Sequence, residues 1–277
     1  MKFSILIAHY NHSVFFRDCY KSLLNQDYKN WEVIILDDAS QFDEKAAVKE
    51  LIKGDSRFKY FENSENSGVG ITKSKLIELS EGDICCFLDP DDAILPSALQ
   101  TAYDVFAKQN DVVLTYSKFV SCDENLKPLH VFKSAMQVQN DDELFFNYPI
   151  QIAHLVCFRK KTYELTEKIN SSLKISEDQD LYLKLYEKGK VKFIDDANYL
   201  YRTHQKGISQ NDNKKISYQY WGKVIFDAMK RRNLSKINGK KIPDFYDKPK
   251  EIFDLLNYQN SVSHRILKKL KILLQKL

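Results

Sequence analysis

Cysteine pairs with the Cys-x-x-Cys spacing of a zinc site are missing from this sequence. Its five cysteines are odd in number, only Cys85 and Cys86 are neighbours, and no Cys-x-x-Cys motif occurs. A disulfide framework needs an even set of cysteines, and structural zinc sites use closely spaced pairs. The cysteine pattern therefore argues against both, and it favours a reducing compartment.

Long apolar runs and a strong excess of one charge are missing as well. No apolar segment approaches the roughly 18 residues that cross a bilayer, and the run at residues 3–8 is too short for a signal peptide. We therefore expect a cytoplasmic protein. The 42 basic residues nearly balance the 38 acidic ones, with a formal net charge of +4, so no nucleic-acid partner is expected.

The 277 residues leave room for one large domain, or for one domain with an appendage. Short apolar runs alternate with segments of helical periodicity in the first half, which predicts right-handed crossovers and a mostly parallel sheet. Strands are predicted at 3–8, 31–36 and 58–61, in the run that ends at Asp89, and at 112–116. Helices are predicted at 14–25, 44–53, 71–79 and 96–108. The alternation then fades into a loop-rich stretch (126–147), a strand (150–158), a helix after residue 176, and two separate strands (191–194 and 199–202).

Polar residues follow three of these strands, where ligands bind in a parallel sheet. They are Tyr10, the pair Asp37-Asp38, and the stretch Asp89-Pro90-Asp91-Asp92. Three carboxylates within four residues repel one another unless a cation or solvent separates them, and Mg²⁺ and Mn²⁺ prefer oxygen ligands. The stretch predicts either a metal site or a solvated acidic turn.

Three further signals are weaker, and each has a structural alternative. The turn Gly68-Val69-Gly70, with Lys73 one helical turn further on, suits a phosphate contact, but it matches neither the dinucleotide fingerprint nor the P-loop and also fits a plain turn. Glu177 and Asp178 open a predicted helix, where acids favour the helix dipole without any catalytic role. His204 is more often a surface or hydrogen-bonded histidine than a metal ligand.

Taken in order, five stretches resemble the inverting glycosyltransferases of family 2, which have the GT-A fold. The resemblance covers about residues 3–210, and the rest of the chain lies outside it. The stretches are Phe3-Ser4-Ile5-Leu6-Ile7-Ala8-His9-Tyr10-Asn11; Ser22 to Tyr28 with Trp31 to Ser40; Asn66-Ser67-Gly68-Val69-Gly70; Phe87-Leu88-Asp89-Pro90-Asp91-Asp92; and Glu177-Asp178 with the later Tyr201-Arg202-Thr203-His204.

The resemblance implies an α/β GT-A fold, a nucleotide-sugar donor, a divalent metal (Mn²⁺ or Mg²⁺) on its diphosphate, and one-step transfer with inversion. It assigns Asp178 as the catalytic base and Asp92, Asp91 and His204 to the metal, with His204 as a further metal or phosphate contact. It assigns the nucleotide-sugar contacts to Ala8, Tyr10, Asp38, Gly68, Lys73, Asp89 and Asp91. Since most relatives use UDP-sugars, a UDP-sugar is the expected donor, and a glycan or lipid-linked glycan of bacterial surface polysaccharide or lipopolysaccharide synthesis is the expected acceptor.

The chain departs from the family pattern in two places. Ala8-His9 replaces a Pro-Thr-like pair, and Thr72-Lys73 stands where Ala-Arg is common. The Gln-x-x-Arg-Trp motif of processive synthases is absent, which favours a single-addition enzyme. A nucleotidyltransferase would need a Gly- and Arg-rich loop after the first strand, where His9-Tyr10-Asn11-His12 stands instead. A catalytically inactive binding protein of the same fold is the remaining alternative.

The expected organisation is a GT-A domain over 1–212, with a nucleotide-sugar half (1–117) and an acceptor and catalytic-base half (118–212), followed by a helical extension over 213–277. Its tail, 261–277, predicts an amphipathic helix suited to an anionic membrane, so that the protein would be peripheral on the inner face of the cytoplasmic membrane. Docking on the protein's own core or on a second subunit is the alternative, and the oligomeric state stays open. Its apolar face holds Val262, Ile266, Leu267, Leu270, Leu273, Leu274 and Leu277, and its polar face holds His264, Arg265, Lys268, Lys269, Lys271 and Lys276, with Ile272 out of place.

Overall fold

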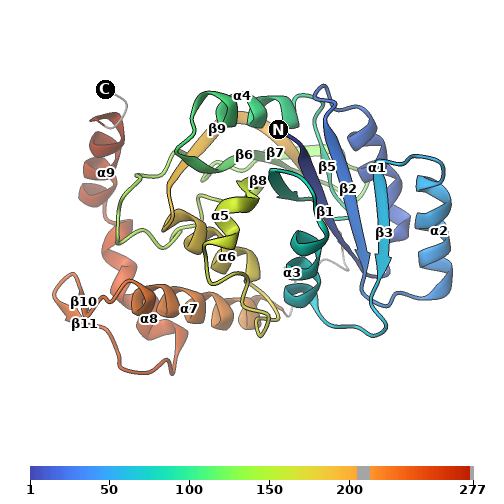
Figure 1. Cartoon of the computed structure of the whole chain (residues 1–277). Coiled ribbons are helices and arrows are strands. Elements are labelled where there is room, and N and C mark those ends of the chain that lie inside the picture. The colour runs from blue at the N-terminus through green and yellow to red at the C-terminus, as the bar shows by residue number, and fades with distance from the viewer. Residues whose placement is uncertain (205–212, 275–277) are drawn as a thin grey trace.

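A curled sheet runs through the chain, with helices on both of its faces (Figure 1). The computed structural model describes residues 1–204 and 213–274. Within these ranges the sheet has nine strands, whose main path is β3-β2-β1-β4-β8-β6-β9-β5, while β7 pairs with β6 at the side. This mixed α/β arrangement confirms the predicted fold class.

The first half of the path is entirely parallel. Every residue of β2 is buried, because helices cover both faces of the sheet here, and this burial explains the continuous apolar runs. Phe16 of α1 and Val48 of α2 pack on one face, and Leu76 of α3 packs on the other. The elements are β1 (Phe3–His9), α1 (Ser13–Leu24), β2 (Trp31–Asp37), α2 (Phe42–Ile52), β3 (Phe58–Glu62), α3 (Val69–Leu79) and β4 (Ile84–Phe87).

The second half of the path is mixed. Strand β8 (His154–Arg159) is antiparallel to both β4 and β6 (Val112–Cys122), and β9 (Lys190–Arg202) is parallel to β6. The two separate strands predicted at 191–194 and 199–202 are therefore one strand. The polar middle of β9 stays in the sheet because it pairs with β6, with shifts of register. The prediction missed this continuity because the pattern of apolar residues along one segment does not reveal which strand it pairs with.

Short strands and helices complete this half. The strands are β5 (Ala93–Ile94) and β7 (Pro128–Val131), and the helices are α4 (Ala98–Lys108), α5 (Lys160–Glu164) and α6 (Glu177–Tyr186). Leu181, Leu183 and Leu185 of α6 are all fully buried, although they do not share one helical face. The helix lies inside the protein, with β6 on one side and the following helix, α7, on another.

The elements between residues 213 and 256 pack on this body from below in Figure 1, and α9 stands at its left-hand side. Val224 and Met229 of α7 belong to the same apolar core as α6, whereas α9 lies apart on the surface. The predicted boundary at residue 212 lies outside the described residues. The elements are α7 (Asn213–Arg231), β10 (Lys236–Ile237), β11 (Lys240–Lys241), α8 (Pro249–Leu256), the 3₁₀ turn η1 (Asn257–Asn260) and α9 (Val262–Leu274). Over the described ranges, every helix is too short or too polar to cross a bilayer.

Candidate active site

Asp38, just beyond the end of β2, holds the glycine turn in place. Its Oδ1 accepts hydrogen bonds from Asn63 Nδ2 at 2.7 Å and from the Ser67 backbone N–H at 2.9 Å. Its Oδ2 accepts a bond from the Gly68 N–H at 2.9 Å. Gly68 has φ +83°, a left-handed conformation that strains residues with a Cβ, so glycine suits this position. Asp38 and Gly68, both predicted as nucleotide-sugar residues, are thus brought together.

The last residues of β1 and β2, His9 and Asp37, form a buried pair. His9 Nδ1 and Asp37 Oδ2 are 2.7 Å apart, and both side chains are fully buried. The parallel register places these two residues opposite each other. The pair anchors the segment that carries Ala8, which is half-buried, and Tyr10, whose ring is exposed at the edge of the sheet.

Asp92 is buried against β9. Its Oδ2 accepts a hydrogen bond from the Tyr199 hydroxyl at 2.6 Å, and its Oδ1 accepts one from the Arg202 backbone N–H at 2.7 Å. Burial, together with the nearby charges of Asp89 and Asp91, raises its pKa well above the usual range of a carboxyl group. Direct binding of the metal by Asp92 stays a prediction. In this structure its carboxylate connects the acidic loop, residues 89–92, to β9.

Arg202 strengthens the same junction from the other side. Its guanidinium donates to the Asp91 carbonyl oxygen at 2.5 Å and to Asp18 Oδ2 on α1 at 2.9 Å, and it lies 4.6 Å from the centre of the Phe15 ring. The side chain of Arg202 is almost fully buried. It therefore joins β9, the acidic loop and α1 at one point.

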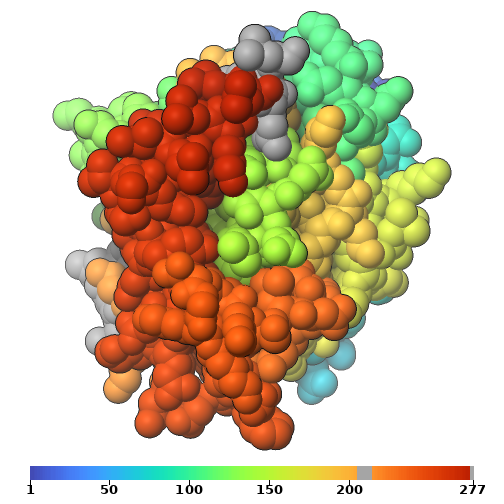
Figure 2. Space-filling model, turned by 90° about the vertical axis from the view of Figure 1, so that its left-hand side faces the viewer, coloured from blue at the N-terminus to red at the C-terminus, as the bar shows by residue number. Residues whose placement is uncertain are grey.

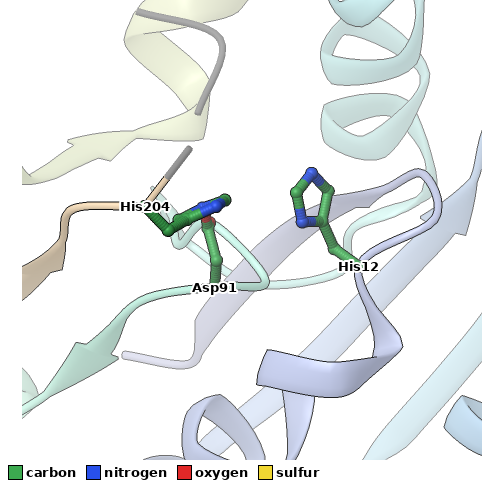
Figure 3. A group of neighbouring side chains, drawn as sticks. All are labelled: His12, Asp91 and His204. Atoms are coloured by element: carbon green, nitrogen blue, oxygen red, sulfur yellow. The ribbon is translucent and has the colours of Figure 1, made fainter. Parts of the chain in front are cut away.

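Asp91 and His204, two predicted metal residues, lie together beside this junction, and His12 completes the group (Figure 3). His204 Nε2 is 2.8 Å from Asp91 Oδ2, and the rings of His12 and His204 have centroids 5.6 Å apart. The ligating atoms of all three side chains lie within 4.8 Å of one another. Imidazole and carboxylate groups both bind divalent transition metals, so these residues fit the implied cation. His12 was not predicted.

A second charged group links α3 to α6. Lys73 Nζ donates to Glu177 Oε1 at 2.6 Å, and both side chains are largely buried. Burial lowers the pKa of Lys73, but the charges of Glu177, Asp89 and Asp178 outweigh it, and the pKa lies above its usual value. For Asp89, burial raises the carboxyl pKa, and Lys73 offsets part of this shift. The predicted residues Lys73, Asp89 and Asp178 thus share one electrostatic environment.

Asp178 stands in the first turn of α6, half-buried beside this ion pair. Ser176 precedes it with φ 68°, which turns the chain sharply into the helix. Asp178 Oδ1 accepts a hydrogen bond from the backbone N–H of Gln179 at 2.8 Å, and the Gln179 side chain accepts a hydrogen bond from Asn147. Glu177 is engaged by Lys73, and Asp178 is the acid that remains partly open to solvent.

His154 on β8 lies against the same acidic loop and was missed by sequence reasoning. Its ring stacks on Tyr199 at a centroid distance of 4.5 Å and on Tyr201 at 5.5 Å. Burial lowers its pKa to about 4, although Asp89 opposes this shift. His154 is therefore a neutral imidazole near pH 7, packed behind the charged residues.

Comparison with known proteins identifies the fold and the family. The chain superimposes on the structure of S. aureus TarS with UDP-GlcNAc at a TM-score of 0.68, with 18% identity over 92% of this chain and 70% of that one. A second TarS structure gives a TM-score of 0.69 at 20% identity over 95% of this chain and 44% of that one. These neighbours have the GT-A fold, in agreement with the sheet described above.

Among curated relatives, chondroitin synthase of Escherichia coli is 27% identical over 245 residues, which are 84% of this chain and 33% of that protein. The putative glycosyltransferase EpsH of Bacillus subtilis (strain 168) is 25% identical over 280 residues, or 97% of this chain and 80% of that protein. The chain thus spans about a third of the length of the first relative. The family model described as "Glycosyl transferase family 2" matches residues 4–165, more than half of the chain. This protein therefore belongs to glycosyltransferase family 2.

Proposed function

We propose that the protein transfers a sugar, with inversion, from a UDP-sugar to a hydroxyl group of a glycan or lipid-linked glycan acceptor in the synthesis of a bacterial surface polysaccharide. The observation that carries this proposal is the convergence of two groups at one edge of the sheet: Asp91 with His204, and Lys73 with Glu177 and Asp178. The first group suits the diphosphate of a donor, and Asp178 of the second group suits the acceptor hydroxyl. Solved neighbours bind UDP and UDP-GlcNAc, and this supports a nucleotide-sugar donor.

Asp178 is the proposed general base. A carboxylate that removes the proton from the acceptor hydroxyl allows its oxygen to attack the anomeric carbon from the face opposite the diphosphate, and this inverts the configuration. Glu177 is held in an ion pair with Lys73, so Asp178 is the acid at the start of α6 that can meet an acceptor. Glu177 and Lys73 position the start of α6.

Asp91 and His204, with His12, are the residues that would hold Mn²⁺ or Mg²⁺. When bound, the cation neutralises charge that develops on the leaving diphosphate. Asp92 contributes through position, because its bonds to Tyr199 and to the backbone of Arg202 hold the acidic loop where Asp91 meets His204. The two imidazoles favour Mn²⁺ over Mg²⁺, which prefers an all-oxygen set.

The nucleotide is proposed to lie over the carboxyl ends of β1 and β2. Asp38 and the Ala8 backbone would contact the base, while the exposed ring of Tyr10 offers a flat apolar surface to it. Gly68 contributes through the turn that Asp38 holds, and Lys73 and Asp89 lie on the side of the sugar and phosphates. We propose a single-addition enzyme of the cytoplasm, peripheral on the inner face of the membrane, where lipid-linked acceptors are found.

A donor screen tests this proposal. Nucleotide sugars are incubated with the protein and Mn²⁺, and release of nucleoside diphosphate is measured, with the Asp178→Asn variant as the control. UDP release from one UDP-sugar, lost in the variant and with EDTA, is expected. Formation of a nucleotide sugar and pyrophosphate from a nucleoside triphosphate and a sugar 1-phosphate, without release of UDP from any sugar donor, would favour the nucleotidyltransferase alternative instead.

A further inference from the structure

Helix α9 contacts the body of the protein through residues spaced four apart. His264, Lys268 and Ile272 are half-buried, and the remaining described residues of α9 are exposed. Lys268 Nζ lies 5.2 Å from the centre of the Phe145 ring, and the rings of His264 and Tyr258 meet edge to face at 5.1 Å. Ile272, the residue out of place in the apolar stripe, instead lines a cavity of about 150 Å³ beside β6 and β9.

The apolar stripe of α9 therefore points away from the protein. At about 100° per residue, the stripe is centred nearly opposite the docked residues. Its described members are exposed by 52% to 73%, and Leu277 lies outside the described residues. They are Val262, Ile266, Leu267, Leu270, Leu273 and Leu274. Figure 2 shows this red segment lying on the surface beside the yellow-green segment that contains Phe145.

Single exposed apolar residues such as Phe245, which is 84% exposed, are common on soluble proteins and need no partner. A contiguous stripe on one helix is different, because large exposed apolar patches mark interaction surfaces. The docking through the opposite face excludes the protein's own core as the cover of this stripe. The remaining candidates are a membrane and a second copy of the chain.

Charge distinguishes these two partners. Lys271 borders the stripe on one side, and Arg265 and Lys269 border it on the other; all three are exposed. Residues 262–274 contain no acid. A second α9 packed on the stripe would set cations against cations, which is unfavourable. An anionic lipid surface supplies the opposite charge along both borders, and each nearby Lys or Arg strengthens that attraction.

We infer that α9 lies in the plane of an anionic membrane interface, with its apolar stripe among the acyl chains and Arg265, Lys269 and Lys271 at the level of the lipid headgroups. Lys268, predicted on the polar face, does not take part, because it packs on Phe145. The role of this contact rests on the proposed function, since it brings the active site to a lipid-linked acceptor. The contact itself can be measured without any acceptor.

The test is flotation of the full chain with vesicles of phosphatidylcholine, with and without phosphatidylglycerol. Binding to the anionic vesicles is expected, weakened by high salt, and reduced at least about tenfold in the double variant Leu267→Asn/Leu270→Asn because its stripe is interrupted. Lys269→Gln/Lys271→Gln should lose most of the preference for anionic vesicles. Phe245→Asn, at an exposed apolar residue outside α9, is the matched control and should bind like the wild type.

Two readouts separate the possible failures. Donor hydrolysis, measured without an acceptor, should be the same in the Leu267/Leu270 variant as in the wild type, since neither residue lies near the active site. If the wild-type protein does not hydrolyse any donor, the proposed function fails, and this inference is not affected. Light scattering after gel filtration reports the oligomeric state. Equal flotation of wild type and stripe variant, no flotation of either, or a dimer that the stripe variant abolishes without any vesicle binding, would each overturn the inference.

Discussion

The ion pair between Lys73 and Glu177 offers a quantitative test of how the site is held together. In the variant Lys73→Met, a side chain of similar length replaces the ammonium group and leaves Glu177 buried without its counter-charge. Two unit charges 2.6 Å apart attract by about 6 kcal/mol at an effective dielectric constant of about 20. Desolvation offsets part of this attraction, and removal of one partner from a buried pair costs about 3–5 kcal/mol.

We therefore expect Lys73→Met to lower the free energy of unfolding by about 3–5 kcal/mol at pH 7, measured by urea denaturation. A domain with about 10 kcal/mol, the middle of the ordinary range, stays folded after such a loss. Because Lys73 also faces Asp89 and Asp178, the variant should release nucleoside diphosphate more slowly than the wild type, even where both are fully folded.

The second pair of α6 provides the control. Lys184 donates to Asp180 at 2.7 Å, and both side chains are buried to a similar degree. Lys184→Met should cost comparable stability and leave turnover of the folded protein unchanged. The double variant Lys73→Met/Glu177→Gln should lose about 2–3 kcal/mol less unfolding free energy than the sum of the losses in the two single variants. Additive effects, or equal turnover in Lys73→Met and Lys184→Met, would refute the reasoning.

Three further predictions concern the base, the metal group and the pH dependence of stability. Asp178→Asn should lower turnover by roughly 10² to 10⁴ while calorimetry shows unchanged affinity for UDP with Mn²⁺; turnover within a few-fold of the wild type would leave Asp178 as a helix-start acid. His12→Phe should weaken binding of Mn²⁺ by at least about tenfold and of Mg²⁺ much less, whereas the same change at exposed His130 should alter neither; equal loss for both metals would count against an imidazole ligand. Burial raises the pKa of Glu32, but hydrogen bonds, chiefly from Lys2 and Ser4, outweigh this effect and lower the pKa to about 2. Glu32 therefore contributes about 3 kcal/mol to the free energy of unfolding. This contribution is fully present above pH 4.5 and is lost as the pH falls toward 2. Glu32→Gln should therefore destabilise the fold at pH 7 and hardly at pH 2.5; a constant difference at both pH values would contradict the low pKa.

The parallel half of the fold was predictable because its signals are local. A strand buried on both faces is a continuous apolar run, and its end is marked by the first polar residues, as at Asp37 and Asp89. The strand β9 was harder, since Asp195 and Asp196 interrupt its apolar run, and only the pairing with β6 shows that it continues. Long-range pairing of this kind has no local signal.

The candidate site shows the same division. The acidic loop was predictable from the sequence, but not which of its adjacent carboxylates, Asp91 or Asp92, points into the protein. That depends on β9, more than 100 residues later, where Tyr199 and Arg202 donate hydrogen bonds to Asp92. His12 belongs to no sequence motif. Its position just after β1 was the one signal that it lies near the carboxyl ends of the parallel strands, where the other site residues lie. Helical periodicity predicted the apolar stripe of α9, but the docked face was not predictable, because the long stem of a lysine packs on an aromatic ring as an apolar side chain does.

The distances along the chain between His12, Asp91 and His204 bear on when the enzyme becomes competent during synthesis. Residues 91 and 204 are separated by 113 positions, and Asp91 lies a further 79 positions (91 − 12) after His12. At about 5–20 residues per second, a ribosome needs several seconds to add the segment that brings His204. A nascent chain that has already folded β1 to β4 would still lack one imidazole of the proposed metal site. Mn²⁺ retention by ribosome-bound chains of increasing length should therefore rise only after β9 and His204 have emerged.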